Sequence, residues 1–200
     1  MIDRRAFLLS TAALLAGVPT CAHARPRLYS TGFLLPEIEL TYESIEVLRQ
    51  ILLRVQRVGL MHNPDWPVDP LRVRQSLRLA EKIGVRFMPA GVRWGDDVEP
   101  AFGTLLAEGA DAVIVPAGVL LAGFHRRIVE QAAANRLPAL YGARGLAEAG
   151  GLISVSPNCP AELSVDQPSN FELIVNLKTA GALGLTVPKS VLLRADRLIE

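Results

Sequence analysis

The chain alternates between short apolar runs and longer stretches in which apolar residues recur every three or four positions. Residues 57–61 and 112–115 are apolar runs, and the second is continuous, as in a strand that is buried on both faces. Residues 69–84, 98–109 and 120–136 carry the helical period. Strands that alternate with helices of this length form βαβ units. The pattern predicts an α/β fold: a three-layer, doubly wound domain with a mainly parallel sheet.

Boundary residues support two of these helices. Asp69 is a predicted N-cap because Pro70 follows it at the first helical position, and Gly84 is the predicted stop of that helix. Asp96 or Asp97 is predicted to cap the next helix. Since an amphipathic helix follows directly, we interpret this pair as capping residues and not as an acid/base pair.

The amino terminus has the composition of an export signal. Arg4 and Arg5 form a positive region, an apolar stretch follows, and a small-x-small site ends at Ala24. We predict a twin-arginine-like signal peptide over residues 1–24 and a periplasmic location, with the general secretory route as the alternative. Lipid attachment at Cys21 is less favoured, because proline and threonine stand where small residues are expected.

The remainder divides into three predicted segments. Residues 25–40 contain two prolines and no clear period, which indicates a linker. Residues 41–158 contain the alternating units and form the predicted α/β ligand-binding lobe. Residues 159–200 are predicted to be a shortened carboxyl-terminal segment with a strand and short helices.

Charge and motifs argue against several classes of function. The formal net charge is +1, so the chain lacks the basic excess that is typical of nucleic-acid-binding proteins. The sequence contains no GxGxxG, GxxxxGK[ST] or GxSxG motif. His62 and His125 have no neighbouring ligand pattern, and His62 is interpreted as a structural residue at the rim of a site. We therefore predict a protein that is not an enzyme and uses no metal, cofactor or nucleic acid.

The predicted site lies beyond the carboxyl ends of the strands, where open parallel sheets bind ligands. Four turns meet there, at residues 63–66, 91–96, 116–120 and 142–144. Their side chains offer amide and phenol hydrogen bonds, flat indole surfaces that include Trp94, and a guanidinium that matches a carboxylate. The predicted ligand-binding residues are Asn63, Pro64, Trp66, Pro116, Ala117, Gly118, Tyr141, Gly142 and Arg144.

Arg144 also has a purely structural interpretation. Glu148 follows it by four residues, so the two side chains could form a surface ion pair on one helix. Both interpretations stay open from the sequence.

Three segments carry a likeness to a known family: RVGLMHNP at 57–64, HRRIVEQAAANRLPALYGARGLAEAGGLISVSPN at 125–158, and QPSNFELIVNLKTAGALGLTVPKSVLLRADRLIE at 167–200. In this order, from Glu43 to Glu200, the sequence resembles the tryptophan-type substrate-binding proteins of ABC importers. The resemblance implies a type I periplasmic binding fold and an exported receptor. Such a receptor closes two lobes around a solute, for example an amino acid, and presents it to an ABC permease in the inner membrane.

The sequence departs from that family in two places. Nearly all of the first lobe, which the family places before Glu43, is missing, and a short link follows Asn158 in place of a helix and a proline-rich connection. Small-molecule sites bury most of the ligand, so we expect a single lobe to bind its solute weakly or not at all. A homodimer could cover the exposed interface.

Two alternatives remain beside a shortened, degenerate transport receptor. One is an interaction or assembly module that pairs through the exposed half-interface. The less favoured one is a small hydrolase-like enzyme that uses His62, Asp65 or Arg144, although the sequence shows no set of nucleophile, base and orienting residue.

Overall fold

The computed structural model describes residues 44–67, 69–117, 123–157 and 171–200. The predicted signal peptide over 1–24, the linker over 25–40, Cys21 and Gly118 lie outside these ranges.

The described residues contain one seven-stranded sheet with the strand order β2-β1-β3-β4-β5-β6-β7. The strands are β1 (Arg57–His62), β2 (Arg86–Gly91), β3 (Ala112–Val115), β4 (Ala139–Tyr141), β5 (Ile153–Pro157), β6 (Phe171–Asn176) and β7 (Arg197–Ile199). Strands β1 to β5 are parallel, β6 is antiparallel to β5, and β7 is parallel to β6. The predicted α/β fold with a mainly parallel sheet is confirmed, with one reversal at β6.

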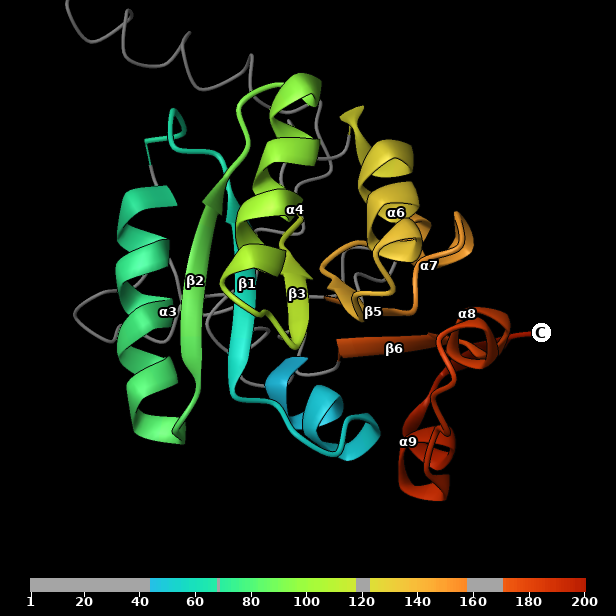
Figure 1. Cartoon of the computed structure of the whole chain (residues 1–200). Coiled ribbons are helices and arrows are strands. Elements are labelled where there is room, and N and C mark those ends of the chain that lie inside the picture. Colours follow the sequence, from blue (N-terminus) through green and yellow to red (C-terminus); the bar gives the residue numbers. More distant parts are fainter. Residues whose placement is uncertain (1–43, 68, 118–122, 158–170) are drawn as a thin grey trace, which may run out of the picture.

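Helices cover both faces of the sheet, so the domain has three layers (Figure 1). They are α3 (Asp69–Ile83), the short 3₁₀ helix η1 (Gly95–Asp97), α4 (Val98–Ala107), α6 (His125–Ala134), α7 (Arg144–Glu148), α8 (Leu177–Ala182) and α9 (Lys189–Arg194). Residues 44–51 are also helical. One face packs against this first helical segment, α3, α8 and α9, and the other packs against α4, α6 and α7.

Strand β3 shows how the sequence produces the two cores. Its side chains alternate, so that Ala112 and Ile114 enter one core while Val113 and Val115 enter the other. All four residues are buried. The continuous apolar run is therefore explained by a strand that has helices on both sides.

The ends of the sheet and of α3 follow simple backbone rules. Pro89 lies in β2, which is an edge strand, so its missing N–H does not interrupt the sheet. Gly84 follows α3 with a φ of 69° and stops the helix, as predicted. Leu106 of α4 lies outside the buried stripe of its helix, since 37% of it is exposed.

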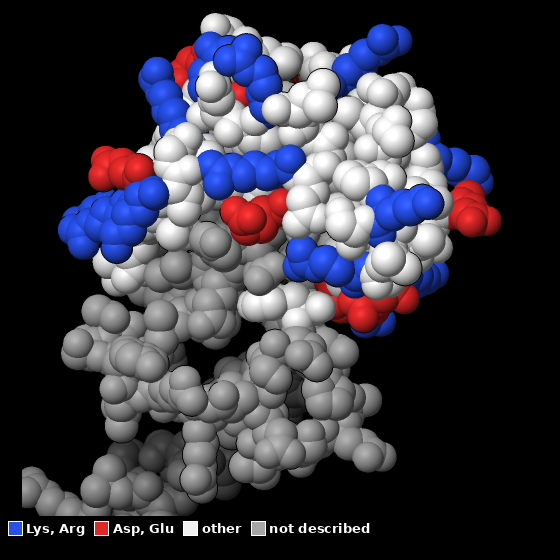
Figure 2. Space-filling view, turned by 90° about the horizontal axis from the view of Figure 1, so that it is seen from below, with Lys and Arg blue, Asp and Glu red and all other residues white. Residues whose placement is uncertain are grey.

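The amino ends of the parallel strands carry mixed charges. Figure 2 looks at this end of the molecule and shows basic and acidic side chains interspersed on the described surface in view. Asp111 lies at this end and accepts hydrogen bonds from the backbone N–H groups of Gln56 and Arg57, at 2.9 and 2.8 Å. These bonds fix the start of β1 against the start of β3.

None of the described helices has the length and apolar character needed to cross a bilayer.

Candidate ligand-binding edge

The first and second turns contact each other at the carboxyl end of the sheet. Arg93 Nε donates to Asp65 Oδ1 at 3.1 Å, which links the turn after β2 to the turn after β1. The backbones are also close, because a β-carbon at Gly91 would lie 3.5 Å from Cγ of Pro64. These two turns form one continuous surface.

The third and fourth turns are in still closer contact. The N–H of Gly142 donates to the carbonyl of Val115 at 2.8 Å, and a β-carbon at Gly142 would lie 2.6 Å from the backbone nitrogen of Ala117. Because β1 and β3 are neighbours, the two pairs of turns lie side by side. We call residues 63–66, 91–96, 116–117 and 142–144 the binding edge.

Asn63 builds the turn that presents Trp66. The residue is 3% exposed, and its Oδ1 accepts from the backbone N–H of Asp65 at 2.9 Å. The N–H of Trp66 donates to the carbonyl of Asn63 at 3.1 Å and closes the turn. Asn63 therefore acts here as a turn-forming residue, as asparagine often does. Trp66 is 36% exposed at the rim.

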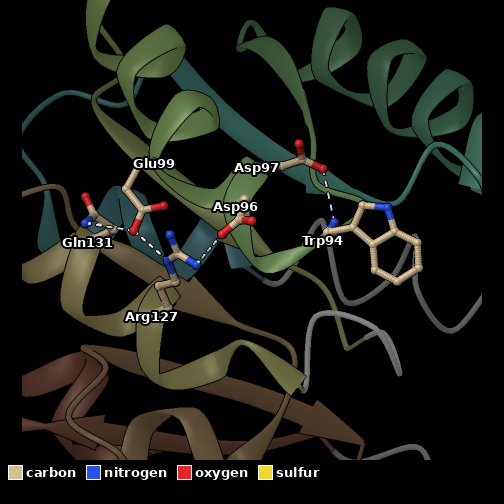
Figure 3. Close-up of polar contacts among 6 residues, drawn as sticks. All are labelled: Trp94, Asp96, Asp97, Glu99, Arg127 and Gln131. Carbon is tan, nitrogen blue, oxygen red and sulfur yellow. Dashed lines mark hydrogen bonds and ion pairs between the residues drawn. The ribbon is translucent and has the colours of Figure 1, made fainter.

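Trp94 is the most exposed aromatic residue among the described residues, with 65% of its surface accessible. Asp97 holds the backbone beneath it, since Asp97 Oδ2 accepts from the N–H groups of Trp94 and Arg93 at 3.0 and 2.8 Å (Figure 3). Asp97 was predicted to cap the helix that follows it. Its carboxylate instead bonds to the start of the short helix η1, and it makes no side-chain hydrogen bond to the amino end of α4.

Asp96 was predicted as an alternative cap, and the structure assigns it a different contact. Arg127 of α6 donates to Asp96 Oδ1 at 3.0 Å and to Glu99 Oε1 of α4 at 2.7 Å (Figure 3). Gln131 adds a longer bond to Glu99 at 3.4 Å. The hydrogen bond from Arg127 lowers the pKa of Glu99, and the two carboxylates raise the pKa of Arg127. This cluster ties α6 to the turn that carries Trp94.

Replacement of Asp97 by asparagine is expected to destabilise the protein at pH 7 and to have little effect in acid. The N–H groups of Trp94 and, second, Arg93 lower the pKa of Asp97 below its ordinary value of 3.8. A lowered folded-state pKa means that the stabilisation is complete above 3.8 and is lost as the pH falls through the folded-state value. Melting temperatures of both proteins at pH 7 and at a pH below the folded-state pKa of Asp97, which itself lies below 3.8, test this. An equal difference in melting temperature between the two proteins at both pH values would contradict this prediction.

Arg144 does not form the alternative ion pair with Glu148. Its Nη2 donates to Oε2 of Glu172 on β6, while Glu148 accepts from Arg197 Nη1 at 2.5 Å. Glu172 was missed by the sequence analysis because it lies 28 positions from Arg144. Its sequence signal is a glutamate as the only charged residue of the strand FELIVN, where a largely buried carboxylate requires a cation.

Tyr141 lies in the core instead of at the binding edge. The residue is fully buried, and its ring packs so closely on Gly151 that a β-carbon there would lie 2.3 Å from Cε2. Burial raises the pKa of the phenol. The hydroxyl has no hydrogen-bond partner among the described residues. The predicted hydrogen bond from Tyr141 to a solute is therefore not available in this conformation.

Replacement of Tyr141 by phenylalanine is expected to raise the free energy of unfolding by about 1 kcal/mol, because it removes a buried hydroxyl that has no partner among the described residues. Urea denaturation of both proteins measures this difference. The same variant distinguishes a packing role of Tyr141 from a role in solute binding. If it lowers the affinity for a solute and leaves the stability unchanged, the phenol does contact the solute as the sequence predicted.

The described residues also form a small open hollow between α6 and α8, lined by residues that include Val129, Leu137 and Leu183. Its lining runs from Leu137 along β4 to Tyr141. No group of three or more His, Cys, Asp or Glu side chains in the described ranges is placed to hold a metal ion.

A family model described as "ABC transporter substrate binding protein" matches residues 25–159, which is more than half of the chain. The chain belongs to this family. A comparison with curated protein sequences gives no match.

Solved structures share the fold of this ABC transporter substrate-binding protein. A conserved domain protein from Vibrio cholerae has a TM-score of 0.67 at 22% identity, over 79% of this chain and 60% of that one. A domain from Streptococcus pneumoniae in complex with L-Trp has a TM-score of 0.67 at 22% identity, over 80% and 62%. A ligand-free, open substrate-binding protein with adhesive properties from Clostridium difficile has a TM-score of 0.65 at 20% identity, over 79% and 59%. The chain thus spans about three fifths of the length of these structures.

Proposed function

We propose that this chain is the non-enzymatic solute-binding component of an ABC importer and that it holds its solute against the binding edge. The observation that carries the proposal is the convergence of four turns at one end of the sheet, with Trp66 and Trp94 exposed on two turns that contact each other. Family membership supports the transport role. Export by residues 1–24 to the periplasm and delivery to an inner-membrane permease complete the proposal.

The proposed solute is an amino acid or a similar small molecule. Exposed indole rings offer flat apolar surface, and Arg144, whose side chain is 54% exposed, offers N–H donors to a carboxylate. A relative of the same fold is in complex with L-Trp, which supports this class of solute.

We propose that binding by the described lobe alone is weak. The binding edge contacts one side of a solute, whereas tight sites bury about 70–90% of the ligand surface. A second surface must therefore cover the solute, either another lobe or, as an alternative, a second copy of the chain. Residues 41–158 form the proposed lobe, and 159–200 the proposed shortened segment, of which β6 and β7 extend the same sheet.

Intrinsic fluorescence gives a direct test, because the chain has only two tryptophans and both lie on the binding edge. Addition of L-phenylalanine to the full chain is expected to change the emission, and Trp94→Phe is expected to remove most of the change because Trp94 is the more exposed ring. Calorimetry of the same mixtures measures affinity independently. Heat of binding without any change in emission would place the solute elsewhere, and no heat up to the solubility limit would contradict solute binding.

A further inference from the structure

We propose that Glu172 is a specificity-determining residue of the binding edge, and that with Arg144 it selects solutes that carry both a carboxylate and an ammonium group. This proposal rests on the solute-binding function proposed above. It adds a residue outside the four turns and a charge rule for the solute.

The two side chains form an unequal pair. Arg144 is the first residue of α7 and its side chain is 54% exposed, whereas the side chain of Glu172 on β6 is only 14% exposed. Arg144 uses Nη2 to donate to Glu172 Oε2. Within the described ranges, neither Nε nor Nη1 of Arg144, nor Oε1 of Glu172, has another hydrogen bond. The pair therefore keeps donors and an acceptor for a third group.

The pair lies at the same end of the sheet as the four turns. Arg144 follows Gly142 by two residues, and Gly142 packs against the backbone of Pro116 and Ala117. Glu172 pairs in register with Ser156, near the carboxyl end of β5. Because β6 is antiparallel to β5, its first residues lie at the edge where the parallel strands end.

The charges of the pair define the solute. Glu172 compensates the charge of Arg144, so a solute with only a carboxylate meets attraction from one group and repulsion from the other. A solute with only an ammonium group is attracted by Glu172 and repelled by Arg144. An amino acid can align its carboxylate with Arg144 and its ammonium group with Glu172, so both contacts are favourable. Selection against singly charged solutes follows from these repulsions.

Three probes of nearly the same shape test the rule: L-phenylalanine, 3-phenylpropionate, which lacks the ammonium group, and phenethylamine, which lacks the carboxylate. Calorimetry on the full chain is expected to show the tightest binding for L-phenylalanine. In Glu172→Gln the repulsion of 3-phenylpropionate disappears, and its affinity relative to L-phenylalanine is expected to rise about tenfold. Glu172→Asp keeps the charge and is expected to keep the wild-type order of the three probes.

Glu46→Gln is the matched control. It removes the same negative charge, but from the exposed pair with Arg49 in the helical residues 44–51, outside the binding edge, where both side chains are 37% exposed. The control is expected to leave the affinity of 3-phenylpropionate relative to that of L-phenylalanine unchanged. If L-phenylalanine binds but Glu172→Gln leaves this ratio unchanged, or Glu46→Gln changes it equally, the role of Glu172 is wrong and solute binding stands. If no probe binds the wild-type chain, both proposals fail.

Discussion

Replacement of Gly151 by alanine is expected to lower the free energy of unfolding by about 3 kcal/mol. The new β-carbon would lie 2.3 Å from Cε2 of Tyr141 and 2.7 Å from the carbonyl oxygen of Leu146. The ring cannot swing away easily, because Tyr141 is fully buried. The carbonyl cannot retreat either, since it accepts a hydrogen bond from Gly151 N–H at 2.8 Å. Urea denaturation followed by circular dichroism measures the loss.

Gly145→Ala is the matched control for this prediction. Gly145 lies in α7, six residues before Gly151, and a β-carbon there would have no described heavy atom within 4 Å beyond its chain neighbours and its own helix backbone. Alanine favours a helix over glycine, so this variant is expected to gain about 0.5–1 kcal/mol. A lower free energy of unfolding in Gly151→Ala together with a higher one in Gly145→Ala would support close packing at Gly151. A loss of similar size in both variants would show that residues 145–151 tolerate no added methyl group at all and would contradict the argument.

The layered fold could be predicted because its elements have distinct hydrophobic periods. The run 112–115 is apolar throughout, and the structure buries it between two cores. Helix α4 likewise follows its buried stripe from Val98 to Leu105. The reversal at β6 was not predictable in the same way, because FELIVN shows only a strand. The direction of a strand depends on the connection before it and on its neighbours.

The position of the four turns was predictable, but the packing of their side chains was not. A general rule for parallel sheets places the four turns at one edge, and the contact of Gly142 with Ala117 agrees with that placement. Whether a side chain at a strand end faces the edge or the core depends on its packing partners. Tyr141 faces the core because Gly151, ten residues later, leaves room for its ring. Arg144 pairs with Glu172 across the fold, which local spacing does not reveal.

Replacement of Gly142 by alanine is expected to lower the free energy of unfolding by about 2 kcal/mol and to weaken solute binding at the same time. Its β-carbon would lie 2.6 Å from the backbone nitrogen of Ala117 and 3.2 Å from the carbonyl carbon of Pro116. Backbone atoms cannot rotate away as a side-chain end can, so the third and fourth turns must separate. The bond from Gly142 N–H to Val115 resists this separation. Denaturation and calorimetry with L-phenylalanine measure the two effects.

Gly91→Ala separates a local clash from a general intolerance of the binding edge. Gly91 ends β2 at the same edge, but its β-carbon would lie 3.5 Å from Cγ of Pro64, which is an ordinary contact. This variant is expected to keep wild-type stability and affinity. A Gly142→Ala protein as stable as wild type would contradict the close approach of the two turns. A destabilised Gly142→Ala protein with unchanged affinity would show that solute binding does not depend on the contact between the third and fourth turns. In that case the separation of these turns would lower the stability alone.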